Sequence, residues 1–91
     1  TDRQASYSVN LYFCEQEKMQ KGERIFDVII QGRKVLEDFD IISETGKENK
    51  ELVKSFSGIR AGRTLTLEMV PKQGNTILSG IELIQESISE I

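Results

Sequence analysis

The stretch RIFDVIIQGRKVLEDF, residues 24–39, has the alternating pattern that decides the fold class of this chain. Successive side chains of a strand point to opposite faces, so every second residue of this stretch shares a face. The apolar residues on the first such face are Phe26, Val28 and Ile30. Gly32 follows, and glycine adopts positive φ without steric cost. The stretch therefore predicts a β-hairpin with strands over residues 24–30 and 33–39.

The same period of two continues on both sides of the hairpin. Upstream, residues 6–13 alternate between apolar and polar side chains. Downstream, three further strands are predicted, at residues 51–57, 64–70 and 77–85, and Pro71 is expected to end the second of them because proline lacks a backbone donor. Six strands spaced about eight to twelve residues apart are typical of an antiparallel β-sandwich or jelly roll.

The segments between these strands are polar or rich in glycine, and they are predicted to be loops. They comprise residues 15–23, 41–50, 58–62 and 72–76. The second of them is expected to hold at most one helical turn, near residues 42–47. The chain of 91 residues is long enough for a single domain, with a core predicted over residues 5–86 and a tail over residues 87–91.

The net charge and the apolar pattern argue against two classes of partner, nucleic acids and membranes. A net charge of -3 leaves no concentrated basic face, which argues against a nucleic-acid partner. No run of about 18 apolar residues is present, so no membrane-spanning helix is predicted. A hydrophobic fraction of 37% and a charged fraction of 30% are typical of a soluble globular chain.

The composition also excludes most catalytic chemistry. The chain has no histidine, which removes Ser-His-Asp and Cys-His nucleophiles and the usual metal sites. The glycines are scattered at turns and form no phosphate-binding loop. Cys14, the single cysteine, ends a predicted strand and is interpreted as a small packed residue. We therefore expect neither a cofactor nor a metal ion.

Two carboxylate clusters leave a glycosidase as an alternative, because those enzymes use two carboxylates across a sugar ring. One cluster contains Glu37, Asp38 and Asp40, and the other contains Glu15 and Glu17. A charge run on an edge strand is more often a solvated face that prevents aggregation. Asp40 is interpreted as a turn or helix-cap residue. The favoured prediction is that the chain is not an enzyme.

Several stretches, read in order, resemble the malectin and malectin-like family. They match the family patterns L-x-F-A-E, R-x-F-D-V-x-I-x-G, D-F-D-I, N-K-x-x-V-K-x-F and N-P-x-L-S-G-I-E. The matching residues are 11–15, 24–32, 35–41, 49–56 and 74–82. The resemblance covers nearly the whole chain, from Tyr7 to Ile84, and it implies a β-sandwich carbohydrate-binding domain of about twice this length. This chain would then be the C-terminal half of such a domain, and the domain it forms would be incomplete.

The resemblance further implies a non-catalytic carbohydrate-binding module, or a remnant of one. The chain looks most like bacterial members attached to glycoside hydrolases of the beta-galactosidase type. That likeness implies an accessory domain of a secreted hydrolase, in the periplasm or outside the cell. The alternative is a structural or protein-interaction sandwich that has lost sugar binding.

The resemblance also places the sugar site in two loops. Glu17 and Lys18 match the tyrosine-phenylalanine sugar platform of malectin, and Gly74 matches its binding aspartate. Sugars bind by stacking on aromatic rings and by planar polar hydrogen bonds, and Tyr12 is the aromatic residue expected to face outward. We therefore expect weak oligosaccharide binding. The candidate binding residues are Tyr12, Glu15, Glu17, Lys18, Gly74 and Asn75.

Two of the predicted strands carry apolar residues on both faces. Ile25 and Ile29 lie opposite Phe26 and Val28, and Leu78 and Ile84 lie opposite Ile77 and Ile81. A single copy with this pattern is expected to expose apolar area or unpaired strand edges. The sequence therefore predicts a homodimer, or docking on the rest of a parent hydrolase. A compact monomer is the alternative.

Overall fold

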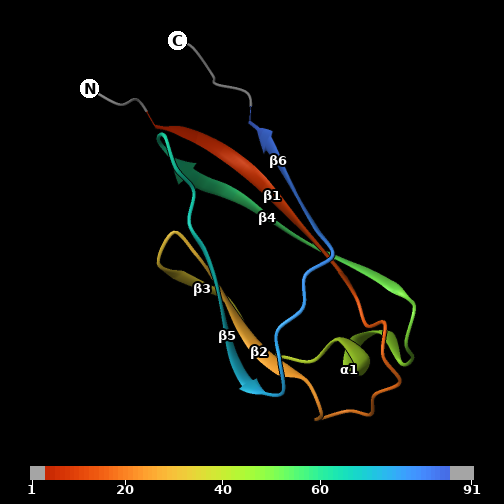
Figure 1. Ribbon diagram of the computed structural model, residues 1–91. Coiled ribbons are helices and arrows are strands. Elements are labelled where there is room, and N and C mark those ends of the chain that lie inside the picture. The colour runs from red at the N-terminus through yellow and green to blue at the C-terminus, as the bar shows by residue number, and fades with distance from the viewer. Residues whose placement is uncertain (1–3, 87–91) are drawn as a thin grey trace.

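The computed structural model describes residues 4–86, which form an almost entirely β structure (Figure 1). The strands are β1 (Ala5–Cys14), β2 (Ile25–Ile30), β3 (Arg33–Phe39), β4 (Glu51–Ala61), β5 (Leu67–Gln73) and β6 (Gly80–Gln85), and the helix is α1 (Ile41–Thr45). The predicted all-β class with six strands is therefore confirmed. The tail predicted at residues 87–91 lies outside the described residues.

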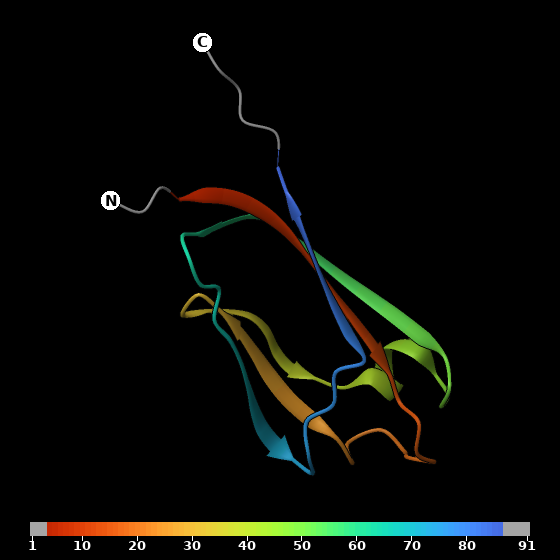
Figure 2. The same cartoon turned by 45° about the horizontal axis from the view of Figure 1, so that its top comes forward.

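The strands form two antiparallel sheets of three strands each. Sheet A has the order β4-β1-β6, and sheet B has the order β3-β2-β5. Figure 2 shows the two sheets as separate layers, and the β2–β3 hairpin is the only connection among the described residues that stays within one sheet. This arrangement confirms the predicted antiparallel sandwich.

The core lies between the sheets and comes mainly from one face of each middle strand. Phe13, Phe26 and Phe39 form its aromatic centre, with ring centroids 4.7 to 6.0 Å apart. Burying one large apolar side chain contributes about 1.5–3 kcal/mol. The buried side chains of β1 and β2, which face each other between the sheets, are therefore the main stabilising feature. The fully buried members of β1 and β2 are Val9, Leu11, Phe13, Phe26, Val28 and Ile30. Phe56 is half-buried and packs against the same cluster.

The hairpin turn forms where it was predicted, but it uses two residues with positive φ. Gly32 has φ 74° and Gln31 has φ 52°, which match the two positive values of a type I′ turn. Hydrogen bonds to Thr66 hold Gln31 in this conformation: the Gln31 N–H donates to the Thr66 carbonyl at 3.0 Å, and the Gln31 Oε1 accepts from the Thr66 N–H at 2.7 Å.

Strand β4 is longer than its sequence pattern predicted. The prediction of a turn over residues 58–62 is wrong, because β4 continues through this segment to Ala61. Gly58, with φ 68°, forms part of a β-bulge where the register with β1 shifts between Tyr7 and Val9. A bulge keeps a strand in its sheet while adding one unpaired residue, so the glycine bends the strand instead of ending it.

The predicted bounds of the last two strands are also wrong. Strand β5 begins at Leu67 and continues past Pro71, which pairs with Phe26. An edge strand tolerates proline because one side of its backbone needs no partner. Strand β6 begins only at Gly80, and residues 75–79 cross from sheet B to sheet A without regular structure.

Helix α1 confirms the single helical turn expected between the third and fourth strands. Asp40 is its N-cap and accepts a hydrogen bond from the Ser43 N–H at 3.3 Å, as its cap interpretation predicted. Gly46, with φ 83°, is the C-cap, and its N–H donates to the Ile42 carbonyl at 2.8 Å. Within residues 4–86, no helix has the length and apolar content needed to cross a membrane.

Candidate functional site

Three connections meet at one end of the sandwich, here called the loop end (Figure 1). They are residues 15–24, residues 40–50 around α1, and residues 74–79. The Asn49 N–H donates to the Glu15 carbonyl at 2.7 Å, which joins the first two connections. Arg24 Nη1 donates to the Asn75 carbonyl at 2.9 Å, so the two loops predicted to form the sugar site, around Glu17 and Asn75, are also close in space.

A buried ion pair between Arg24 and Glu15 holds the loop end together. Arg24 Nε donates to Glu15 Oε1 at 2.6 Å, and Arg24 Nη2 donates to Glu15 Oε2 at 3.1 Å. The third guanidinium nitrogen, Nη1, donates to the Asn75 carbonyl at 2.9 Å. The bond to Glu15 raises the pKa of Arg24 above its already high ordinary value, while burial acts in the opposite direction.

The structure divides the predicted loop residues into supporting and exposed groups. Glu15 is 1% exposed and both of its carboxylate oxygens are bonded to Arg24, so its role is structural. Gly74 is also structural: it has φ 71°, and a Cβ there would lie 2.7 Å from the Glu23 carbonyl oxygen. The side chains left at the surface belong to Glu17, Lys18 and Asn75.

Tyr12 does not belong to the loop end surface but to the outer face of sheet A, which points away from the core. Its hydroxyl donates to Glu82 Oε1 at 3.1 Å, and Asn10 Nδ2 donates to the same oxygen at 2.8 Å. These two bonds lower the pKa of Glu82, and the bond to Glu82 raises the pKa of Tyr12. Asn10 could have been found from its spacing of two from Tyr12, but only the β1–β6 register brings Glu82 beside them.

Four of the five carboxylates in the possible glycosidase clusters contact basic partners, and the fifth, Asp40, accepts from the Gly22 and Ser43 N–H groups. Asp38 pairs with Lys72 at 2.6 Å, and Glu37 lies 3.4 Å from the Lys34 ammonium. Glu15 and Glu17 both contact Arg24. Among residues 4–86, no group of three acidic or cysteine side chains is arranged to hold a metal ion.

Asp27 supports sheet B from its outer face. Its Oδ1 accepts a hydrogen bond from the Asp38 N–H at 2.8 Å, at a position of β3 where Asp38 has φ 51°. Lys34 and Lys72 lie 3.3 and 3.5 Å from its carboxylate oxygens. The Asp38 hydrogen bond and these two lysines lower the pKa of Asp27, against the effect of burial.

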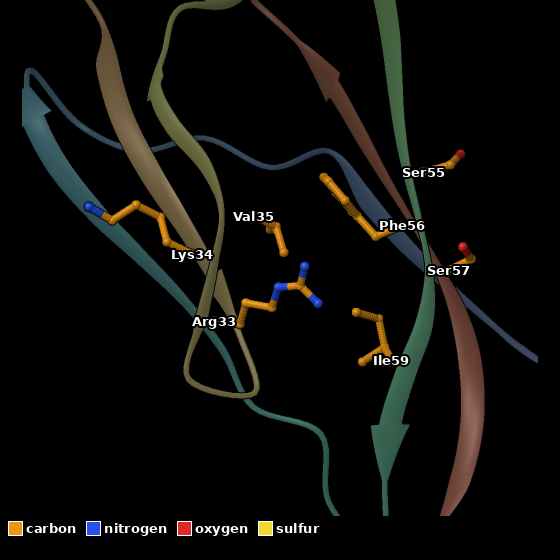
Figure 3. Close-up of a pocket in the computed structure, with 7 residues that line it drawn as sticks. All are labelled: Arg33, Lys34, Val35, Ser55, Phe56, Ser57 and Ile59. Atoms are coloured by element: carbon orange, nitrogen blue, oxygen red, sulfur yellow. The ribbon is translucent and has the colours of Figure 1, made fainter.

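A cleft of about 340 Å³ opens between the edge strands β3 and β4 (Figure 3). The guanidinium group of Arg33 projects into it among the apolar side chains of Val35, Phe56 and Ile59 (Figure 3). The sequence patterns did not indicate this cleft, because it forms where an edge of each sheet faces the other.

These features define a β-sandwich domain that gathers its long connections into one surface around a buried ion pair. The chain belongs to the Malectin domain family, which matches it over residues 1–81. The resemblance to the malectin family is therefore confirmed.

The relatives that were found are plant receptor-like proteins. Receptor-like protein 4 of Arabidopsis thaliana is 39% identical over 83 residues, which is 88% of this chain and 13% of that protein. A probable LRR receptor-like serine/threonine-protein kinase of the same organism is 30% identical over 95 residues, covering 86% of this chain and 9% of the kinase. The chain thus spans 9% to 13% of the length of these relatives. No solved structure matches.

These relatives are receptor-like proteins and not glycoside hydrolases. They support the coarser part of the family resemblance, which is the malectin domain itself. Attachment to a bacterial hydrolase of the beta-galactosidase type stays a prediction that they do not support.

Proposed function

We propose that the chain is a non-catalytic carbohydrate-binding module within an extracellular, receptor-like protein. The observation that carries this proposal is the match to the Malectin domain family over residues 1–81. The receptor-like relatives favour this parent over a secreted hydrolase, and they favour an extracellular over a periplasmic location. The hydrolase accessory domain is kept as the alternative parent.

The geometry of the loop end supports binding but not tight binding. The Arg24–Glu15 pair holds the two loops that carry Glu17, Lys18 and Asn75. These side chains offer charged and amide hydrogen-bonding groups, but none of them offers an aromatic ring for stacking. We therefore expect an affinity at this surface on the order of 1 mM, or about -4 kcal/mol.

Affinity gel electrophoresis tests the proposal. The chain is run through gels that contain one dissolved polysaccharide each: starch, galactan, xyloglucan or polygalacturonate. Retardation by at least one polysaccharide, together with no release of nitrophenol from an aryl-glycoside panel, is the expected result. Migration unchanged in every gel would contradict carbohydrate binding, and turnover of a glycoside would contradict the non-catalytic assignment.

The cleft between β3 and β4 favours a second candidate, a protein-interaction domain. It combines three apolar side chains with the cationic Arg33 at an open edge of the sandwich. A cleft of this kind suits an apolar peptide segment that carries a carboxylate. Two observations together would favour this candidate. The chain would bind no polysaccharide, and the NMR signals of Arg33 and Phe56 would shift when the rest of the parent protein is added.

A further inference from the structure

The outer face of sheet A presents one aromatic ring beside an open position. The register places Tyr12 between Val53 on β4 and Gly80 on β6. A Cβ at Gly80 would lie 3.8 Å from both Cβ and Cδ2 of Tyr12, so the tyrosine side chain lies alongside the glycine. Because Gly80 has no side chain, nothing at this position stands up against that side of the ring. We call this surface the Tyr12 platform and define it by Tyr12, Asn10, Glu82, Gly80 and Val53.

Two planar polar groups flank the ring in fixed positions. Glu82 Oε1 accepts hydrogen bonds from both Asn10 Nδ2 and the Tyr12 hydroxyl, at 2.8 and 3.1 Å. Among residues 4–86, no side chain donates a hydrogen bond to the other carboxylate oxygen, Oε2, or to the Asn10 Oδ1. These oxygens are therefore acceptors held beside an aromatic ring, and they are available to a ligand that donates several hydrogen bonds.

We infer that the Tyr12 platform binds a ring of a neutral oligosaccharide. A pyranose ring has an apolar face of C–H groups that stacks on an aromatic ring, and equatorial hydroxyls that donate to carboxylate and amide oxygens. The platform offers both kinds of contact within one face of three strands. This inference rests on the proposed carbohydrate-binding function and assigns to it the stacking ring that the loop end does not offer.

The charge of this face determines the class of sugar. The side chains that share this face include the carboxylates of Glu51, Glu82 and Glu86, and one cation, Arg60, which lies opposite Ser6. The one lysine of sheet A, Lys54, pairs with Glu44 at 2.7 Å and lies over the Phe39 ring of the core. Arg60 bonds to Gln4 and is paired six residues along β1 from Tyr12, whereas Glu51 and Glu82 lie on the strands beside the ring. Carboxylates so placed repel uronates and sulfated sugars. The ligand is therefore neutral and rich in hydroxyl groups.

Strand β1 supplies a matched control for the ring. Tyr7 is half-buried like Tyr12 but lies at an odd-numbered position, on the opposite face of β1. It lines a smaller hollow with Leu65 and Leu83. Removing Tyr7 thus removes the same side chain from the same strand without touching the platform.

The experiment is a titration of the ¹⁵N-labelled chain with cellotriose, maltotriose and trigalacturonate, followed by NMR. We expect at least one neutral trisaccharide to shift the Asn10 side-chain amide and the backbone signals of Tyr12, Gly80 and Glu82. We expect Tyr12→Ala to weaken this binding at least about tenfold, corresponding to about 1.4 kcal/mol. Tyr7→Ala should leave the affinity within about twofold, and trigalacturonate should cause smaller shifts than either neutral sugar.

Two further variants keep the test valid if Tyr12→Ala fails to fold. Tyr12→Phe keeps the ring, and Glu82→Gln keeps the side-chain shape while removing the charge; each should weaken binding roughly two- to tenfold. Shifts confined to residues 15–18 and 72–76 would overturn the platform while leaving the proposed function intact. Tighter binding of trigalacturonate would overturn the sugar class. Absence of shifts with every sugar, combined with no retardation in any polysaccharide gel, would overturn both the platform and the proposed function.

Discussion

At the scale of single residues, Arg24 joins parts of the chain that are far apart in the sequence. Its guanidinium contacts the Glu15 and Glu17 side chains and the Asn75 carbonyl. The Glu15 carboxylate has no access to solvent, and Arg24 is the cation that pairs with it. A buried pair of this kind is costly to break, because removing one partner leaves the other charge buried and unpaired.

Replacing Arg24 with methionine is therefore expected to destabilise the chain strongly. Arg24→Met should lower the free energy of unfolding by about 3–5 kcal/mol, measured by urea denaturation. Arg33→Met is the control, because Arg33 is exposed on β3 and its loss should change stability by no more than about 0.5 kcal/mol. Equal losses in the two variants would show that Arg24 does not hold the loop end together.

The depressed pKa of Asp27 predicts how stability depends on pH. The Asp38 N–H and the two lysines stabilise the ionised carboxylate in the folded state, so the folded pKa lies below the unfolded value of about 3.9. Asp27 thus stabilises the fold above that value, and this contribution is lost as pH falls through the lower folded pKa.

Thermal unfolding measured from pH 6 down to pH 2 tests this expectation. Asp27→Asn should be less stable than the wild type at pH 6, and the difference should shrink below about pH 4. Glu68→Gln, which removes an exposed carboxylate from neighbouring β5, is the control. A constant difference between Asp27→Asn and the wild type at every pH would contradict the assigned role.

At the scale of elements, the connection after β5 needs a glycine for two separate reasons. Gly74 has φ 71°, and a Cβ at this position would lie only 2.7 Å from the Glu23 carbonyl oxygen. Gly46 at the end of α1 has a similar φ of 83°, but a Cβ there would meet nothing within 4 Å. The comparison between these two positions separates backbone strain from steric overlap.

Alanine substitutions at both glycines make that comparison. Gly46→Ala should lower the free energy of unfolding by about 1–2 kcal/mol, which is the typical cost of a left-handed alanine. Gly74→Ala should cost at least about twice as much, because a backbone oxygen cannot rotate away from the new methyl group. Chemical denaturation measures both, and equal costs would mean that the close approach to Glu23 is easily relieved.

At the scale of the whole molecule, the two sheets leave apolar area along β6. Ile81 and Leu83 are 47% and 49% exposed, although the register places them on the same face as the buried Leu11 and Val9. Strand β6 is an edge of sheet A among the described residues. The Glu86 N–H donates to the Ser6 carbonyl, and in an antiparallel pair every second residue bonds to the neighbouring strand. The backbone groups of Ile81, Leu83 and Gln85 therefore point away from β1, toward the open edge.

We therefore expect a homodimer in which β6 of one copy pairs antiparallel with β6 of the other. A two-fold axis at Leu83 sets each Glu82 opposite an Ile84, so the carboxylates do not face one another. Such pairing satisfies the edge and covers the exposed apolar residues. It also leaves the outer face of sheet A, with the Tyr12 platform, open to ligand.

Sedimentation equilibrium at micromolar concentration tests the dimer. Leu83→Lys should give the monomer, because it places charge at the centre of the pairing. Val70→Lys should leave the dimer intact, because Val70 is an exposed residue of the other sheet. A wild-type sample that sediments as one species of 10.3 kDa would contradict the dimer and favour a compact monomer.

The sequence alone determined the class of fold and the position of its core. The period of two in β1 and β2 reports which side chains face the partner sheet, since alternation is a local property of an extended chain. The cap role of Asp40 and the glycine of the hairpin turn were readable for the same reason, because caps and turns depend on neighbouring residues. The family resemblance also needed only the ordered motifs.

Tertiary structure decided the strand ends and the chemistry of the candidate sites. Pro71 stays within β5 because that strand is an edge, and β4 passes through residues 58–62 because a bulge absorbs Gly58. Glu15 was expected to face a ligand, but burial against Arg24 makes it a support. Glu82 joins Tyr12 and Asn10 only through the pairing of β1 with β6, which are separated by most of the chain. Contacts between distant segments depend on register and sheet order, and no local pattern in the sequence specifies these.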